Sequence, residues 1–140
     1  MAKRIALKDY VSVDHVDLSD FSSAVQFSSA HAQVDVSGFN STGSDEFLAG
    51  ATTQTVTVTF FGSYGSGEVH QTIYPLHRDK SVFAFAWRPD GSAGASSTNP
   101  ELRGNVQAFD YGPGATRGSV DSFSVTFQAS TGSTLVFYET

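Results

Sequence analysis

The residues Thr53-Gln-Thr-Val-Thr-Val-Thr-Phe-Phe61 decide the fold class of this chain. Threonines at every second position alternate with Val56, Val58 and Phe60. Successive side chains of a strand point to opposite faces, so this spacing puts hydroxyl groups on one face and apolar groups on the other. The stretch therefore predicts a β-strand that buries one face only.

A glycine-rich turn and one helix are expected directly after this strand. Residues 62–67 contain three glycines, which adopt the backbone angles of a sharp turn without steric cost. In the ten residues from Glu68 to His77, apolar side chains recur at positions 69, 73 and 76, which is the spacing of one helix face. The pattern predicts a single helix that packs on the sheet.

Alternating segments predict further strands along the chain. Residues 81–87 place Phe83, Phe85 and Trp87 on one face of a strand. Shorter or later strands are expected at 32–37, 101–109, 119–128 and 134–138. The region 16–27 contains acidic interruptions and fits either an imperfect strand or an extended arm.

Two polar stretches are expected to form loops. Residues 38–50 begin and end with glycine, and they are predicted to hold one helical turn, capped by Ser44 and containing Asp45 and Glu46. Residues 90–99 are rich in Gly, Ala and Ser, which is the composition of a mobile loop. Neither loop marks a domain boundary.

The composition supports a mainly β protein. The 140 residues include twelve Phe, five Tyr and one Trp beside thirteen Gly, and the aromatic side chains favour pleated sheet. A chain of this length can bury a stable core without the help of disulfides or bound metals. It has no cysteine, and therefore neither disulfides nor thiolate sites. We predict one mainly β domain over residues 1–140, built as a β-sandwich or rolled antiparallel sheet with one flanking α-helix.

Charge is distributed unevenly along the chain. The formal net charge is −6, yet Lys3, Arg4 and Lys8 place three positive charges in the first eight residues. Residues 9–140 carry five basic against fourteen acidic groups, so we expect a basic N-terminal arm over about residues 1–10 and an acidic body. An acidic body disfavours conventional nucleic-acid binding, because duplex affinity comes mainly from Lys and Arg that displace counterions. A solubilising role alone would also explain the acidity.

Neither a secretory signal nor a membrane span is expected. The first residues lack the apolar run that a secretory signal requires. No later segment is apolar for the ~20 residues that cross a bilayer. We therefore predict no membrane insertion and a soluble protein made in a cytoplasm.

The residues that usually carry catalysis or metal binding are scattered. His70 and His77 are two helical turns apart, about 10 Å along a helix axis, which is too far for one metal ion. Asp14-His15-Val16-Asp17 lacks a second ligand set, and no lysine follows the glycines of 62–67 as it does in a phosphate-binding loop. We predict no catalytic residue, no cofactor, no metal and no enzyme activity.

Four motifs in a fixed order resemble a known family. They are Glu46-Phe-Leu-Ala-Gly50 before the Thr/Val strand, Gly67-Glu-Val-His-Gln-Thr-Ile-Tyr-Pro-Leu76, Thr98-Asn-Pro-Glu101 before a strand that reaches Tyr111, and Gly118-Ser-Val-Asp-Ser-Phe-Ser-Val-Thr-Phe127. In this order they are similar to the major tail proteins, or tail tube proteins, of long non-contractile-tailed phages, especially those of actinobacterial hosts. The resemblance covers roughly residues 30–130.

This resemblance implies a structural virion protein of the tail, assembled in the host cytoplasm. Subunits of the family form hexameric rings that stack into a tube, through which double-stranded DNA is ejected. The implied partners are other copies of the chain and the tape-measure, terminator and tail-tip proteins. Residues expected on the lumen side are Thr55, Thr57, Thr59, Asn105, Gln107, Ser122, Ser124 and Thr126. Expected ring-to-ring contacts are Lys3, Arg4, Lys8, Asp45 and Glu46.

Three other functions remain open at this point. A tail terminator or neck ring protein shares the fold but forms one ring only. A carbohydrate-binding β-sandwich would use exposed aromatic rings such as Tyr64, Trp87 and Tyr111 as stacking platforms. A hydrolase that uses unrecognised carboxylates would need a cleft with perturbed acids, with Asp110 or Glu101 essential for turnover. For glycoside chemistry, two carboxylates would have to be paired in space.

Overall fold

The computed structural model describes residues 4–39, 43–130 and 133–140. Lys3, one of the predicted contact residues, lies outside the described part of the chain. No helix among the described residues is long and apolar enough to cross a membrane. The elements are, in chain order, β1 (Tyr10–Val13), β2 (Val16–Asp17), the 3-10 helix η1 (Ser19–Phe21), β3 (Ser22–Asp35), β4 (Phe47–Phe61), α1 (Val69–Arg78), β5 (Phe83–Arg88), β6 (Glu101–Ala108), β7 (Ser122–Ala129) and β8 (Val136–Tyr138).

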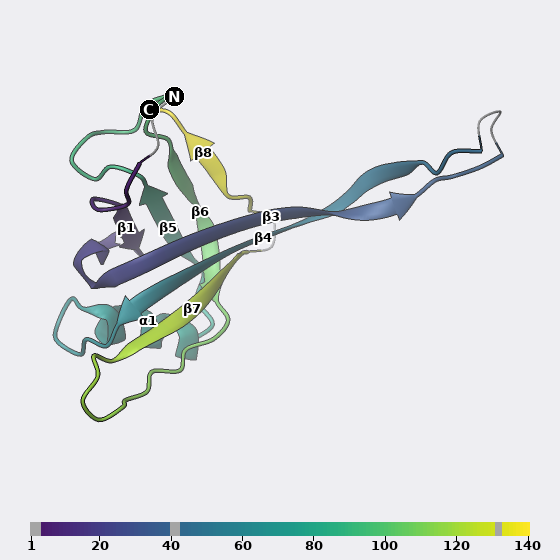
Figure 1. The fold of residues 1–140 in the computed structure, drawn as a ribbon. Coiled ribbons are helices and arrows are strands. Elements are labelled where there is room, and N and C mark those ends of the chain that lie inside the picture. The colour runs from purple at the N-terminus through teal and green to yellow at the C-terminus, as the bar shows by residue number, and fades with distance from the viewer. Residues whose placement is uncertain (1–3, 40–42, 131–132) are drawn as a thin grey trace.

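One antiparallel sheet of eight strands makes up most of the molecule (Figure 1). Its strand order is β2-β1-β5-β6-β7-β4-β3. The remaining strand, β8, pairs with residues 101–103 of β6, while β7 pairs with residues 106–108 of the same strand. β3 forms a long edge of this sheet, and the predicted mainly β class is confirmed.

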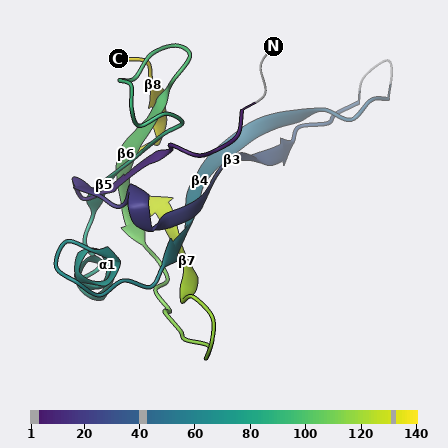
Figure 2. The same ribbon diagram turned by 60° about the vertical axis from the view of Figure 1, so that its left-hand side comes forward.

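The sheet is rolled so that its two halves face one another. In Figures 1 and 2, β3, β4 and β7 form one layer, and β1, β5 and β6 form a second layer. Gln54 of β4 closes the roll, because its amide donates a hydrogen bond to the Leu135 carbonyl at 3.0 Å and accepts one from the Leu135 N–H at 2.8 Å. Phe27 of β3 also meets Phe137 of β8 edge to face at 5.7 Å. The predicted rolled antiparallel sheet is confirmed.

Apolar side chains between the two layers form the core. The predicted alternation of β4 is confirmed, since its apolar positions 56, 58 and 60 are fully buried. The Phe127 ring is central, with its centroid 5.5 Å from that of Phe85 and 5.7 Å from that of Phe83. The buried apolar residues are Val11, Val13, Leu18, Val56, Val58, Phe60, Val69, Ile73, Phe83, Phe85, Leu102, Val106, Phe123, Val125, Phe127 and Leu135.

Helix α1 packs against the rolled sheet through its apolar face. Val69 and Ile73 are fully buried in the core, as their spacing predicts. Beyond the last turn, the Gln107 side-chain amide donates a hydrogen bond to the Lys80 carbonyl at 3.1 Å, which ties the end of the helix to β6. The predicted helix is therefore confirmed, with limits one residue later than expected.

The largest departure from the sequence prediction is a long hairpin that projects from the body (Figure 1). The β3–β4 ladder continues outward to the pairs Val34–Leu48 and Asp35–Phe47. The predicted helical turn within 38–50 is wrong, because residues 47–50 belong to β4 and residues 44–46 are not helical. The predicted short strand at 32–37 is not a separate element. Its residues 32–35 are the outer end of the longer strand β3, where both faces are exposed.

The region 16–27 is divided among three elements. β2 and η1 come first, and β3 begins at Ser22, so the interrupted strand is correct for part of the region and the extended arm is wrong. The loop 90–99 is organised by the buried side chain of Asn99, whose amide donates to the Asp90 carbonyl at 2.9 Å and accepts from the Asp90 N–H at 2.9 Å. The loop 90–99 lies close to the C-terminal end of the chain (Figure 1).

We expect Phe127→Ala to lower the free energy of unfolding by about 3–5 kcal/mol, because it leaves a cavity among other aromatic rings. Urea denaturation measures this loss. Phe109→Ala is the matched control, since the Phe109 side chain is 57% exposed and its removal should change stability by about 0.5 kcal/mol or less. Equal losses in the two variants would contradict the central position of Phe127.

Candidate assembly surfaces

The outward face of β3, β4 and β7 is polar and uncharged. The register places Gln26 beside Thr57 and Thr57 beside Thr126, and neighbouring outward positions repeat this pattern of hydroxyl and amide groups. β4 and β7 contain no Asp, Glu, Lys or Arg, and β3 contains only Asp35, at its far end. We call these outward residues the polar face: Gln26, Ser28, Thr55, Thr57, Thr59, Ser124, Thr126 and Gln128.

Seven of the eight predicted lumen residues lie on or next to the polar face. Five are members of it, Ser122 continues it along β7, and Gln107 of β6 pairs with Gln128. The Thr59 and Ser124 hydroxyl oxygens lie 3.0 Å apart across two strands. Asn105 instead lines a pocket on the other layer, because the sheet has turned before it reaches this part of β6. The structure therefore gathers most of this predicted set on one surface.

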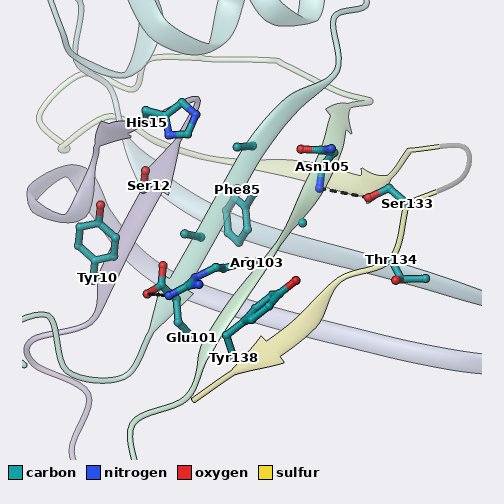
Figure 3. A pocket seen from close by; sticks show the side chains of 13 residues that line it. Tyr10, Ser12, His15, Phe85, Glu101, Arg103, Asn105, Ser133, Thr134 and Tyr138 are labelled. Carbon is teal, nitrogen blue, oxygen red and sulfur yellow. Dashed lines mark hydrogen bonds and ion pairs between the residues drawn. The ribbon is translucent and has the colours of Figure 1, made fainter. Parts of the chain in front are cut away.

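The outward side of the second layer holds a pocket of about 600 Å³ (Figure 3). Ala84 and Ala86 of β5 lie in it as small side chains. Two tyrosines, Tyr10 of β1 and Tyr138 of β8, stand at its rim in Figure 3. The small side chains in the middle and the large ones around them create the pocket, and Glu101 and Arg103 also line it.

An alternating chain of rings and charges ties four strands together beside this pocket. The Arg88 and Arg103 guanidinium groups donate to one Glu101 carboxylate oxygen at 2.9 Å and 3.3 Å. Arg88 also lies over the Tyr10 ring at 4.3 Å, and Arg103 over the Tyr138 ring at 4.8 Å. Burial opposes ionisation of Glu101, but the two arginines outweigh it and hold the pKa of Glu101 below its ordinary value. The network joins β1, β5, β6 and β8.

The two carboxylates named for a hydrolase do not share a site. Glu101 begins β6 and is held by the two arginines, whereas Asp110 follows the end of β6 and accepts a hydrogen bond from the Thr126 N–H at 2.7 Å. Nine residues of mostly extended chain separate them by roughly 25 Å. Catalytic carboxylate pairs in glycosidases lie within about 10 Å. Both acids therefore have structural roles here.

The aromatic residues named for carbohydrate binding are also dispersed. Tyr64 and Tyr111 flank His70, and the Tyr111 hydroxyl lies 2.8 Å from His70 Nδ1. Burial raises the pKa of the Tyr111 phenol to about 12. Trp87 lies elsewhere, where its indole N–H donates to Asp9 at 2.9 Å. These three rings form no common stacking platform.

The remaining polar motifs have local explanations. Asp14 and His15 form the turn between β1 and β2 with positive φ angles of 50° and 65°. At the turn 62–67, the Glu68 carboxylate accepts hydrogen bonds from the Ser63 hydroxyl and from the Gly65 N–H. These donors of the glycine-rich turn are therefore used by a side chain of the protein itself, in the place where a phosphate-binding loop would hold a phosphate. No group of three His, Asp or Glu side chains that could hold a metal occurs among the described residues.

The projecting hairpin exposes apolar side chains far from the core. We call residues 28–39 and 43–53 the arm, in which almost every side chain is exposed. Val34 and Leu48 form a cross-strand pair near its end, and they are 47% and 61% exposed. The predicted contact residues Asp45 and Glu46 immediately precede β4 and are exposed.

The first described residues lie along the surface as a strap, which we define as residues 4–9. Arg4 donates two hydrogen bonds to the Asp9 carboxylate, both at 3.0 Å, and the same carboxylate accepts the Trp87 indole N–H. Ile5 and Leu7 are 80% and 81% exposed. Arg4, a predicted contact residue, is therefore engaged within the subunit, whereas Lys8 is exposed.

Three solved structures share this fold. The virion of a native gene transfer agent particle aligns over 96% of this chain and 99% of its own, with a TM-score of 0.74 and 14% identity. The tail of an empty gene transfer agent particle, refined with C6 symmetry, aligns over 83% and 82%, with a TM-score of 0.66 and 13% identity. The SPP1 tail tube aligns over 95% and 77%, with a TM-score of 0.64 and 13% identity. The fold is that of a tail tube protein.

At this level of identity, the similarity concerns the fold. Neither a protein-family model nor a curated protein matches the sequence. The tail-tube fold that the four sequence motifs predicted is nevertheless confirmed, and it extends over more of the chain than the motifs do. In the tail of the empty gene transfer agent particle, copies with this fold are related by C6 symmetry.

We expect Glu101→Gln to lower the free energy of unfolding by about 1.5–3 kcal/mol at pH 7, because two arginines lose a charged acceptor. The folded pKa of Glu101 lies below its ordinary value of 4.5. Its ionised form therefore stabilises the fold above that pH, and the contribution is lost as pH falls through the folded pKa. Urea denaturation at a series of pH values should show the difference between the two proteins shrinking at acid pH. A constant difference would contradict the role of the carboxylate charge.

Proposed function

We propose that this chain is the structural subunit of a phage tail tube, which self-assembles into hexameric rings that stack and enclose the path of DNA ejection. The observation that carries the proposal is the uncharged polar face on β3, β4 and β7. It occurs in a chain whose charged residues make up 16% of the total, yet β4 and β7 contain none. This face is proposed to line the lumen.

An uncharged surface suits a channel through which DNA must slide. Lysine and arginine would bind phosphates and release counterions, which would hold the duplex in place. Hydroxyl and amide groups keep the channel wetted by water without that attraction. The fold similarity to tail structures supports the same assignment, since it includes a tail with C6 symmetry.

The free edge of the sheet supports assembly of many copies. β3 is an edge strand of 14 residues, and its outer side offers unpaired backbone groups to another strand. An isolated two-stranded hairpin is at best marginally stable in water, so the projecting arm is expected to gain order from contact with other subunits. We propose that the partners are further copies of this chain, together with tape-measure, terminator and tail-tip proteins. The virion tail is then its location after assembly in the host cytoplasm.

Negative-stain electron microscopy over a concentration series tests the proposed function. Long hollow tubes or stacked sixfold rings are the expected result. Isolated rings that never stack would instead assign a terminator or neck role, and a protein that stays monomeric at every concentration would refute ring assembly.

Single cysteines test which face lines the lumen, because the chain has no cysteine of its own. We expect Ser124→Cys on the polar face to react with a polyethylene-glycol maleimide in the free subunit and to be at least tenfold slower in assembled tubes. Gln71→Cys on α1 is the matched control and should remain reactive, since the exposed Gln71 lies on the opposite side of the core. Equal protection of both positions, or of neither, would place the polar face outside the lumen.

A further inference from the structure

The pocket on the outward side of the second layer gathers polar side-chain groups that no described residue hydrogen-bonds. Elsewhere in the body such groups are paired, as Gln54 is with Leu135 and Asn99 with Asp90. The unpaired groups of the pocket are the hydroxyls of Tyr10, Ser12 and Tyr138, the side-chain amide of Asn105 and one carboxylate oxygen of Glu101. Polar groups that converge on one hollow are typical of a ligand site.

Glu101 supplies the strongest hydrogen-bond acceptor in this pocket. Its side chain is 10% exposed, and both arginines donate to the same carboxylate oxygen, Oε2. The other oxygen, Oε1, is open to solvent, because no sealed polar side-chain atom among the described residues lacks a partner. In Figure 3 this oxygen points away from the Arg103 guanidinium. It can therefore accept a hydroxyl group of a bound molecule, and such a bond to an ionised acceptor is stronger than a neutral one.

The strand register determines the floor of the pocket. Ser12, Ala86 and Arg103 are neighbours across β1, β5 and β6, and Ala84 pairs with Asn105. All five belong to the lining, so they lie on the same face of the sheet. The two alanines thus form a small apolar floor, with hydroxyl, amide and charged groups on either side of it.

The rim of the pocket is held in place before any ligand arrives. Arg88 covers one face of the Tyr10 ring and Arg103 covers one face of the Tyr138 ring, and Glu101 fixes both arginines. Figure 3 shows the two tyrosines on opposite sides of the hollow. Side chains that are already ordered lose little entropy when a ligand binds between them.

The chemistry of the lining fits a neutral molecule that is rich in hydroxyl groups. Its one acid, Glu101, is balanced by its one arginine, Arg103, and an anionic ligand would meet the carboxylate. An apolar ligand would leave the polar groups unpaired, which is costly. A peptide strand would need backbone partners, but the floor is the face of a sheet whose backbone groups pair with neighbouring strands. A saccharide ring has an apolar face of C–H groups and a rim of hydroxyls that both donate and accept hydrogen bonds.

We propose that this pocket binds a neutral saccharide, with one pyranose ring over Ala84 and Ala86 and its hydroxyls bonded to Glu101 and Asn105. The proposal goes beyond tube assembly, because the pocket is complete within one subunit. The polar face belongs to the opposite layer of the roll (Figures 1 and 2). In the proposed tube, whose lumen the polar face lines, the pocket therefore opens on the outer side. Many copies on one tube bind a polysaccharide by avidity even where each site is weak.

Saturation-transfer NMR tests the site, and it works equally on free subunits and on large assemblies. The probes are the methyl glycosides of glucose, galactose, mannose and N-acetylglucosamine. A ligand of this size is expected to bind with a Kd on the order of 1 mM. We expect at least one of the four to give a saturating signal. No saturation by any of them up to about 50 mM would overturn the proposal.

Two further probes separate saccharide binding from other uses of the pocket. Cyclohexanol has a ring of similar size but one hydroxyl, so it should bind at least tenfold more weakly than the best glycoside, because Glu101 and Asn105 are left without partners. Inorganic phosphate should not displace the bound glycoside. Equal binding of cyclohexanol would indicate a simple apolar hollow, and displacement by phosphate would indicate an anion site. Either result would overturn the proposal.

Two variants place the binding in this pocket. Asn105→Ala removes an exposed amide and Ala86→Leu fills the floor, and each should weaken glycoside binding at least tenfold. Gln71→Ala and Ala115→Leu are the matched controls at exposed positions outside the lining, and both should bind as the wild type does. Circular dichroism confirms that each variant is folded, and Asn105→Ala alone decides if Ala86→Leu is not. Wild-type affinity in a folded pocket variant would overturn the assignment.

The outcomes keep this site distinct from the tube function. Glycoside binding by a protein that forms no tubes would support the site and contradict the tube, and tubes of a protein that binds none of the four glycosides would do the reverse. Sedimentation of wild-type tubes with dextran, galactan or mannan identifies the source of the saccharide. Co-sedimentation that Asn105→Ala abolishes assigns a surface polysaccharide, whereas binding of the methyl glycosides alone assigns a free sugar.

Discussion

Strand β4 has to satisfy two environments at once, and the rest of the subunit depends on it. In its inner half, the apolar side chains at positions 56, 58 and 60 are fully buried, while the threonines at 55, 57 and 59 face outward with hydroxyl and amide groups of β3 and β7. Over residues 55–60 the strand is paired on both sides, by β3 and β7, so the backbone groups of this part are satisfied within the sheet. The core therefore forms on one side of β4 only, and the other side remains available for the polar face that is proposed to line the lumen.

The outer part of the same hairpin leaves the core behind, and there the balance changes. Beyond residue 28 of β3 both faces of the ladder are exposed, so burial no longer contributes to its stability. Apolar pairs such as Val34 and Leu48 are then a cost to the isolated subunit. The proposed assembly of copies would relieve that cost. In that proposal, neighbouring subunits cover the polar face, the open β3 edge and the arm.

Much of this architecture was predictable from local pattern. The alternation in 53–61 and the spacing of Val69 and Ile73 identified the half-buried strand and the helix, because both depend on periods that burial imposes. The loop assigned to 38–50 was wrong for residues 47–50, which belong to β4, because the outer part of this strand has no buried face to impose a clear period. Residues 47–49 form a strand because they pair with residues 33–35 across the hairpin, and the sequence alone does not reveal this pairing.

The sequence by itself established the class of fold, the uncharged character of the segments that form β4 and β7, and the acidic body with its basic N-terminus, since these follow from composition and short-range spacing. Only the tertiary structure decided which polar residues share a surface. The roll of the sheet carries Asn105 away from Thr57 and into a pocket beside Glu101. It also separates Asp110 from Glu101 and commits Arg4 to Asp9. These placements depend on contacts between residues far apart in the chain, and a local pattern contains no information about such distances.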